Sequence, residues 1–310
     1  MQLTRRQFIA STAVLGASTA FAGPAAAADK SLNLVLIGDW GRHGHDEQRA
    51  VAVQMGKTAE AIGSRFTVSV GDNFYENGVT GVNDAQWRSS FEEIYTAPAL
   101  QSPWKVILGN HDYRGNVQAQ LDYSKTSHRW QLPARSYTET VTLPDGARAA
   151  FYYLDTSPFI KKYYGSKVRV DGQDSQAQLA WLDAKLAAST AEWNIVIGHH
   201  PVYTALADND GYDHDQPDLI ARLNPILQKH NVPVYICGHD HVLQSVQMDG
   251  ITYVVTGAGS QTYTPRAAIR GGFASGAHGF MTVRLSGKSF DYGLVDMHGT
   301  TLFAQTITRA

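Results

Sequence analysis

Residues 32–41 read LNLVLIGDWG, an apolar run that ends abruptly at a glycine and an aspartate. The six residues before the glycine have the Leu, Val and Ile content of a buried strand. Residues 46–62 then place apolar side chains at helical spacing, and residues 66–70 form a second apolar run that ends at Gly71. A strand, a helix and a strand in this order predict a β-α-β unit, and therefore an α/β fold.

The same alternation continues through the middle of the chain and then changes. We expect helices at 176–188 and 217–229 and strands at 104–108, 151–154, 194–197 and 233–236. From residue 251 onward the pattern predicts strands without helices, at 251–256, 280–285, 289–295 and 301–308, with a long loop at 262–279. The sequence shows no internal repeat and no domain-scale linker, so we expect one domain over residues 29–310.

Five short blocks of metal-ligand residue types follow five of the expected strands. They read GDWG at 38–41, GDNFY at 71–75, GNHD at 109–112, GHHP at 198–201 and GHDH at 238–241. Sites in α/β proteins gather outside the carboxyl ends of the strands, so we expect these blocks to converge. Their donors have the types and number that two adjacent metal ions need. Oxygen donors come from Asp39, Asp72, Tyr75 and Asn110, and imidazoles come from His199, His239 and His241.

Each block taken singly has a structural alternative. An aspartate after a strand is commonly a helix cap or a turn residue, and a lone histidine after a buried strand is commonly a core residue. Tyr75 also has a structural alternative, as a core aromatic beside Phe74. The pair His239 and His241 favours metal binding, because residues two apart reach one site from a tight loop but not from a helix face.

The composition excludes several classes of function. The 310 residues are 43% hydrophobic and 17% charged, with a formal net charge of −2, so nothing attracts the chain to nucleic acid or to an anionic membrane. Cys237 is the only cysteine, which rules out an intrachain disulfide. Its place after an apolar run predicts an inert core residue, with a ligand or nucleophile as the alternative.

The first 28 residues are predicted to be a targeting segment. Residues 4–9, TRRQFI, resemble a twin-arginine export signal, and the apolar stretch 10–21 is followed by AAA at 26–28, a small-residue cleavage pattern. A membrane anchor is the alternative, but residues 10–21 are too short and too polar to span a bilayer. We therefore expect an exported protein, periplasmic or secreted, that crosses the membrane folded and keeps no stable membrane association after cleavage.

The five blocks, in this order, resemble the calcineurin-like metallophosphoesterases. Within that superfamily, a tyrosine three residues after the second aspartate, here Tyr75 after Asp72, makes the chain resemble the purple acid phosphatase branch. The stretch 110–133, which contains NHD, GNV, YSK and RW, resembles the small, animal-type, tartrate-resistant enzymes, and the similarity extends from about Leu32 to near the C-terminus. The resemblance implies an αββα sandwich of two mixed β-sheets flanked by helices, with a dimetal site at the carboxyl ends of the strands.

The resemblance also implies a ligand assignment for a dinuclear centre. An Fe(III) site takes Asp39, Tyr75 and His241, and a divalent site for Fe, Zn or Mn takes Asn110, His199 and His239, with Asp72 bridging the two. The donor types agree with this division. A phenolate and carboxylates are hard anionic donors that favour ferric iron, whereas an amide and two imidazoles suit a divalent ion.

The activity implied by the resemblance is an acid phosphatase that hydrolyses small phosphate monoesters. A hydroxide generated by the two metals attacks phosphorus in line, and His111 protonates the leaving group. We expect an acid optimum and a monomeric enzyme. A phosphodiesterase or nucleotide hydrolase is the alternative that uses the same site, and a metal-containing binding protein with little turnover is the alternative from another class.

Several positions depart from the animal enzymes. Those enzymes carry a second substrate-side histidine nine residues beyond the position of His199, where this chain has Asp208, and His214 is a candidate replacement. In the animal enzymes the segment that corresponds to 157–174 is an inhibitory loop that proteases cut. Its sequence is different here, so we do not expect this chain to be controlled by cleavage. Lys161 and Lys162, within this segment, are either a solvated surface pair or residues that attract phosphate. His43 and His45 are either ordinary loop residues or a border of the substrate mouth.

Overall fold

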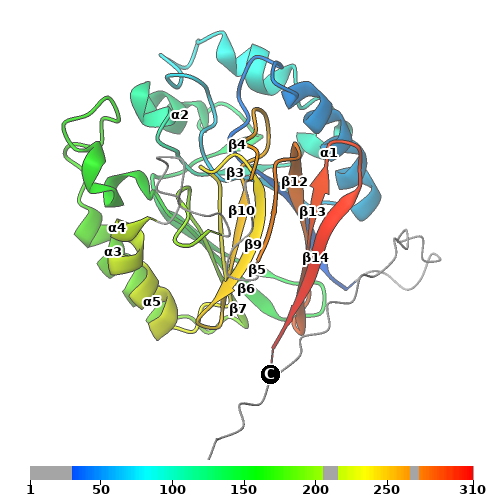
Figure 1. Cartoon of the computed structure of the whole chain (residues 1–310), viewed down its shortest axis with the longest axis vertical. Coiled ribbons are helices and arrows are strands. Elements are labelled where there is room, and N and C mark those ends of the chain that lie inside the picture. Colours follow the sequence, from blue (N-terminus) through cyan, green and yellow to red (C-terminus); the bar gives the residue numbers. More distant parts are fainter. Residues whose placement is uncertain (1–29, 205–215, 266–271, 310) are drawn as a thin grey trace, which may run out of the picture.

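The structure is a computed structural model that describes residues 30–204, 216–265 and 272–309. Two seven-stranded sheets lie face to face, with helices on their outer sides (Figure 1). The first sheet has the order β14 (Thr301–Thr308), β13 (Ser289–Asp296), β12 (Gly279–Leu285), β1 (Leu32–Ile37), β2 (Phe66–Ser69), β3 (Trp104–Val106) and β4 (Trp130–Gln131). The second has the order β11 (Phe273–Ser275), β9 (Leu243–Met248), β10 (Ile251–Thr256), β8 (Val234–Cys237), β7 (Trp193–Ile197), β6 (Arg148–Tyr153) and β5 (Tyr137–Thr142).

Both sheets are mixed. Strands β1 to β4 run parallel, as do β6, β7, β8 and β10, and every other pairing is antiparallel. The helices are α1 (Gln48–Ile62), α2 (Val117–Tyr123), α3 (Ser175–Ala187), α4 (Pro217–Arg222) and α5 (Asn224–Lys229), joined by several single helical turns. The predicted sandwich of two mixed sheets flanked by helices is confirmed.

Strand β1 explains why the first apolar run has no polar alternation. Leu34 and Leu36 face the second sheet and pack in the core between the two sheets. Val35 and Ile37 face the other way and pack in the core beneath the helices, which includes Met55 of α1. A parallel strand buried on both faces needs a continuous apolar sequence, and the whole of β1 is buried.

Two predicted helices differ from the structure. The first begins at Gln48 rather than residue 46, because Asp46 and Glu47 have positive φ angles of 51° and 65°, which no α-helix accommodates. The single helix predicted at 217–229 is broken at Leu223 into α4 and α5. Pro225 causes the break, since proline lacks the N–H that a helix interior requires and its ring clashes with the preceding turn.

Some short elements were not predicted. The loop expected at 262–279 contains the short strand β11, which pairs with β9 at the edge of the second sheet. Strands β4, β5 and β9 and helix α2 were also missed. The predicted targeting segment, residues 1–28, lies outside the described residues, so this boundary stays a prediction. In the part of the chain that is described, no helix combines the length and the apolar character that crossing a bilayer requires.

Candidate metal centre

The candidate site lies where the carboxyl ends of parallel strands from both sheets meet. Asp39, Asp72 and Asn110 follow β1, β2 and β3 of the first sheet, and His199 and the pair His239 and His241 follow β7 and β8 of the second. Asp39, Asp72 and His199 are at most 2% exposed, and Tyr75, Asn110 and His241 are also buried. The structure therefore brings together all seven residues that were predicted as ligands, six of them buried and His239 half-buried.

One half of the site is organised around the Tyr75 hydroxyl. This oxygen lies 3.0 Å from Asp39 Oδ1, 3.2 Å from Asp72 Oδ2 and 3.0 Å from His241 Nε2. The contacts join three blocks that lie far apart in the sequence. Tyr75 is buried but is not simply a core aromatic, because its hydroxyl faces two carboxylates and an imidazole.

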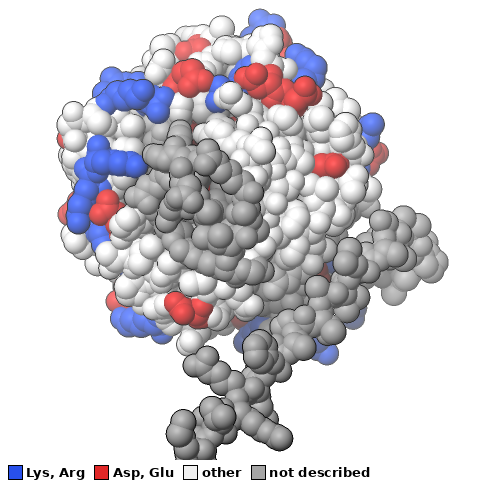
Figure 2. All heavy atoms as spheres, viewed as in Figure 1, with Lys and Arg blue, Asp and Glu red and all other residues white. Residues whose placement is uncertain are grey.

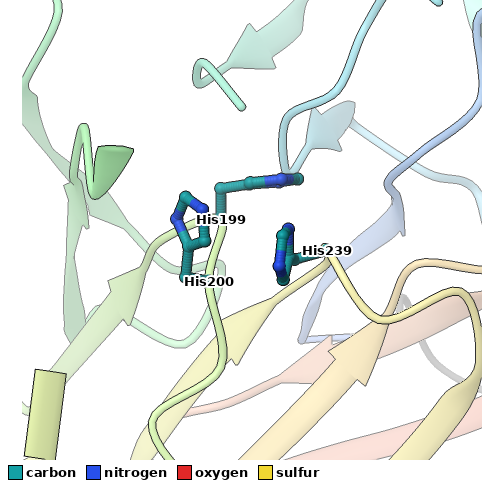
Figure 3. Close-up of side chains that lie close together, drawn as sticks. All are labelled: His199, His200 and His239. Carbon is teal, nitrogen blue, oxygen red and sulfur yellow. The ribbon is translucent and has the colours of Figure 1, made fainter. Parts of the chain in front are cut away.

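The other half of the site contains two imidazoles and an amide. His239 Nδ1 lies 2.9 Å from Asn110 Oδ1, and His199 Nε2 lies 3.4 Å from Asp72 Oδ1. Figure 3 shows His199 and His239 with their rings gathered in one place, together with His200. The ring centroids of His199 and His239 are 5.2 Å apart. Asp72 thus faces Tyr75 with one carboxylate oxygen and His199 with the other.

The donors fit metal ions. His199 Nδ1 lies 2.9 Å from the carbonyl oxygen of Val70, which only an N–H satisfies, so Nε2 is the nitrogen left for a metal ion. That Nε2 is buried and has no hydrogen-bond partner among the described residues. Asp39, Asp72 and His199 each offer a ligand atom within 4.8 Å of the others. Burial lowers the pKa of His199, but the charges of Asp72 and Asp39 outweigh it and raise this pKa to about 9, so a metal ion at Nε2 would take the place of a proton.

The ionisation of the cluster follows from burial and close charges. Burial, with the nearby charge of Asp72, raises the pKa of the Asp39 carboxyl, although His199 opposes the shift. Burial acts the same way on Asp72, but the imidazoles of His199, His111 and His239 outweigh it and hold its pKa well below the usual value. Burial lowers the pKa of His241 to about 4, so this imidazole is neutral near pH 7 and able to bind a metal.

Backbone strain marks three of the candidate ligands. Asp39, Asp72 and His239 have φ angles of 59°, 48° and 70°, in the left-handed region that L-residues seldom adopt. Two glycines allow the close approach of the blocks. A Cβ at Gly109 would lie 2.2 Å from Asp72 Oδ1, and a Cβ at Gly238 would lie 2.4 Å from Asp39 Oδ2. Glycine is therefore required at both positions for the carboxylates to reach the site.

Asp112 fixes the second and third blocks relative to each other. Its buried carboxylate accepts hydrogen bonds from the backbone N–H of Gly109 at 2.8 Å and of Asn73 at 3.1 Å, and from Gln120 of α2 at 2.8 Å. Burial and the charge of Asp72 raise the pKa of Asp112 to about 7. Asp112 is close to the site, but these contacts make it a support for the backbone rather than a ligand.

His111 lies at the open side of the site. Its side chain is 15% exposed, its Nδ1 lies 2.7 Å from the carbonyl oxygen of Glu76, and its Nε2 lies 3.9 Å from Asp72 Oδ2. The ring also packs against that of Tyr75, with centroids 4.4 Å apart. Burial lowers the pKa of His111. The residue predicted as the proton donor thus borders the cavity that leads to the candidate ligands.

Two residues with no role in the sequence-based prediction belong to the site. His200 Nδ1 lies 2.9 Å from Thr156 Oγ1, its Nε2 lies 3.1 Å from the Tyr163 hydroxyl, and its ring packs 4.5 Å from that of His239. Both of its nitrogens have protein partners, so it supports the site rather than offering a lone pair. Its place beside His199 in the fourth block was the available signal.

Arg42 is the second residue that was missed. Its guanidinium carbon lies 3.8 Å from the centre of the Tyr75 ring, and Nε donates to Ser260 Oγ at 3.2 Å. The side chain also forms an ion pair with Glu76. Arg42 follows the GDWG block directly, and only the turn after β1 brings its side chain back over Tyr75.

The remaining sequence candidates have mixed outcomes. Cys237 is buried in β8, as expected of a core residue. His43 and His45 are exposed loop residues that do not line the cavity at the site. Asp208 and His214 lie outside the described residues, so the replacement of the second histidine stays a prediction.

The chain is similar to phosphatases across nearly its whole length. The profile of the calcineurin-like phosphoesterase family matches residues 32–243. The chain is 36% identical to purple acid phosphatase 7 of Arabidopsis thaliana, covering 91% of this chain and 87% of that protein. It is 33% identical to human tartrate-resistant acid phosphatase type 5, covering 91% and 92% of the two chains.

Solved structures share the fold. GAP50 of Plasmodium, described as the anchor in the inner membrane complex, matches with a TM-score of 0.79 and 24% identity over 90% of this chain and 89% of that one. The purple acid phosphatase PPD1 of yellow lupin matches with a TM-score of 0.64 and 15% identity, over 91% of this chain and 54% of that one.

Proposed function

Since this chain belongs to the calcineurin-like phosphoesterases and, within them, to the purple acid phosphatases, we propose that it is an exported acid phosphatase of small phosphate monoesters. The family implies a dinuclear metal centre. One observation carries the proposal: Asp72 directs Oδ2 toward Tyr75 at 3.2 Å and Oδ1 toward His199 at 3.4 Å. A carboxylate placed between two donor sets in this way is suited to bridge two metal ions.

The donor sets divide between the two positions. Asp39, Tyr75 and His241 would hold Fe(III), Asn110, His199 and His239 would hold a divalent Fe, Zn or Mn ion, and Asp72 would contact both. The ions would supply Lewis acidity toward the phosphate oxygens and an acidified water as nucleophile. Because ferric iron is the stronger Lewis acid of the pair, we expect an acid optimum, and an optimum above neutral pH would contradict the ferric assignment.

The protein groups around the ions have separate tasks. His111 is held by the Glu76 carbonyl through Nδ1, which directs Nε2 toward the site. In the imidazolium form this Nε2–H donates a proton to the departing alkoxide. The burial of Asp39, Asp72 and His199 excludes bulk water from the metal side of the site, which strengthens every charge interaction there.

The proposal is tested by an assay of iron-loaded protein at acid pH. The assay compares the rate of hydrolysis of a phosphate monoester with that of the matching diester. A strong monoester preference supports it. A diester preference would favour a phosphodiesterase or nucleotide hydrolase with the same ligands. Absence of turnover with both metals bound would favour a metal-containing binding protein, a reading kept open by the fold shared with GAP50, which is described as an anchor. Asp72→Asn is the matched negative control.

Export and assembly are part of the same proposal. The twin-arginine-like segment at 4–9 supports translocation of the folded, metal-loaded protein to the periplasm or the medium, with cleavage near residue 28. We propose a monomer with small phosphorylated substrates as its only partners, and no binding of nucleic acid. N-terminal sequencing of the exported protein and its sedimentation in solution test these two points.

A further inference from the structure

A cavity of about 680 Å³ opens over the candidate metal centre and is strongly cationic at its outer wall. Besides candidate ligands and His111, its lining includes Arg42, Arg114, Lys162 and Lys167. The carboxylates among its described lining residues are Asp72, at the metal side, and Glu76, which is paired with Arg42. Among the described residues, the outer wall therefore has more positive than negative charge.

Lys162 and Lys167 differ from their neighbour Lys161. Lys161 Nζ lies 3.4 Å from Asp218 Oδ1, and Lys161 does not line the cavity. For Lys162 and Lys167 no ion pair is found among the described residues, and both line the cavity. All three lysines are exposed, so the two possibilities left open for the pair at 161 and 162 are separated by position: Lys161 pairs with Asp218 away from the cavity, and Lys162 lines it.

The segment that bears these lysines is anchored in place. The Tyr163 hydroxyl lies 3.1 Å from His200 Nε2, Ser166 Oγ donates to the Tyr163 carbonyl at 2.7 Å, and Arg169 N–H donates to the Tyr113 carbonyl at 3.4 Å. These contacts lie between and beside the two lysines. Lys162 and Lys167 line the same cavity as the candidate ligands His239 and His241, which places both lysines at the site.

The positive charge continues beyond the cavity. A neighbouring cavity of about 620 Å³ shares Arg114 with the first, also contains Arg135 and Arg169, and has no carboxylate among its described lining residues. Segment 157–174, green in Figure 1, lies on the left of the molecule, and Figure 2 shows Lys and Arg side chains gathered on that side. An anion longer than a single phosphate thus meets positive charge in the direction away from the metals.

We propose that Lys162 and Lys167 form a second anion subsite, which makes the enzyme prefer substrates carrying another phosphate group near the one that is hydrolysed. The inference rests on the proposed phosphatase function and adds the class of substrate to it. One dianionic phosphate matches the charge of two ammonium groups, and among the described residues neither lysine has an ion-pair partner to give up when it binds.

The test compares alkanediol monophosphates with the corresponding bisphosphates. The two phosphates of each bisphosphate are equivalent, so the bisphosphate differs from the monophosphate only by the second phosphate group and its charge. The holoenzyme is assayed as wild type, as Lys162→Ala/Lys167→Ala and as Lys161→Ala, the matched control on the same segment. Wild type and Lys161→Ala should prefer the bisphosphate of suitable chain length roughly 5- to 30-fold in kcat/KM, mainly through KM, as expected for two partly exposed ion pairs. This preference should fall as salt is added.

The double variant should lose most of that preference and keep its turnover of the monophosphate. Equal losses on both substrates, or an unchanged preference, would overturn the second subsite while leaving the phosphatase function intact. Failure of wild type to hydrolyse either substrate would instead contradict the proposed function. A circular dichroism melt of each variant checks that the protein as a whole keeps its fold and stability.

Discussion

At the scale of single residues, the candidate site is built on strain that the surrounding packing holds in place. Asp39, Asp72 and His239 keep left-handed backbone conformations, which cost about 1–3 kcal/mol each for residues other than glycine. The turns that result direct three side chains back toward one point beyond the sheet edges. The cost is tolerable because Asp39 and Asp72 are fully enclosed and their neighbours fix them from several sides.

Tyr75→Phe should abolish visible colour in the iron-loaded protein. If Tyr75 binds Fe(III) as proposed, charge transfer from its phenolate to the ferric ion would give a visible absorption band, and phenylalanine has no oxygen to donate. The absorption spectrum and the iron content, measured on the same sample, check this outcome. Iron content should persist in part, because Asp39, Asp72 and His241 stay in place. A variant that holds iron and keeps the wild-type band would show that another group is the chromophore.

Arg42→Gln should shift the same band to longer wavelength. The guanidinium lies 3.8 Å above the Tyr75 ring, so its charge stabilises the electrons of the ring. Removing that charge raises the energy of the phenolate donor and reduces the energy of the transition. The spectrum of the ferric protein measures the shift, and Arg42→Lys should preserve part of the original position. A shift to shorter wavelength would contradict this account of Arg42.

The sequence predicts candidate ligands better than it predicts the residues around them. Asp39 and Asp72 are recognisable because residue type and position after a strand coincide. Arg42 lacks such a signal, since an arginine in a turn has many common uses, and the only signal for His200 is its place beside His199, which does not specify a role. Their roles depend on which side chains the folded chain places against Tyr75 and His239, and this information is not local in sequence.

At the scale of elements, strongly apolar strands were predicted and weak or short ones were missed. Strand β1 is apolar at every position except Asn33 and is buried throughout, whereas β5 alternates half-buried and exposed residues at the edge of its sheet. Strand β11 is three residues long and is defined by its pairing with β9. Such edge strands form because a neighbour is present, so their own sequence carries little signal.

An element-scale prediction concerns Asp155, which follows β6 and joins the two sheets. It accepts a hydrogen bond from Tyr113, in the turn after β3, and burial raises its pKa from 3.8 to about 6. The folded protein thus holds this proton more tightly than the unfolded chain. The contribution of Asp155 to stability is greatest below pH 4 and is lost as the pH rises to about 6, by at most about 3 kcal/mol.

Asp155→Asn removes that pH dependence. Urea unfolding of wild type and variant between pH 4 and pH 7 measures it as the difference in unfolding free energy at each pH. The stability of wild type relative to the variant should decline across this interval. A constant difference would mean that Asp155 titrates alike in the folded and unfolded states.

At the scale of the whole molecule, the fold places half of the site on each sheet. Asp39, Asp72 and Asn110 follow strands of the first sheet, and His199 and His239 follow strands of the second. Metal ions held between them therefore join the two layers of the sandwich directly. The order of the five blocks in the sequence predicted this convergence, because parallel strands bring their carboxyl ends to the same edge.

Removal of the metals should lower the melting temperature by about 8–16 °C. Ions present at roughly a thousand times their dissociation constant stabilise the folded state by about 4 kcal/mol, and each kcal/mol moves the midpoint by about 2–4 °C in a chain of this size. Without them, the charge of Asp72 disfavours the ionisation of the buried Asp39 carboxyl. Calorimetry of metal-free and reloaded protein measures the change. Asp72→Asn should melt below the metal-free wild type, since it removes a carboxylate whose charge the neighbouring imidazoles stabilise, and should gain less when metals are added. Equal melting temperatures with and without bound metal would show that the ions do not link the two sheets energetically.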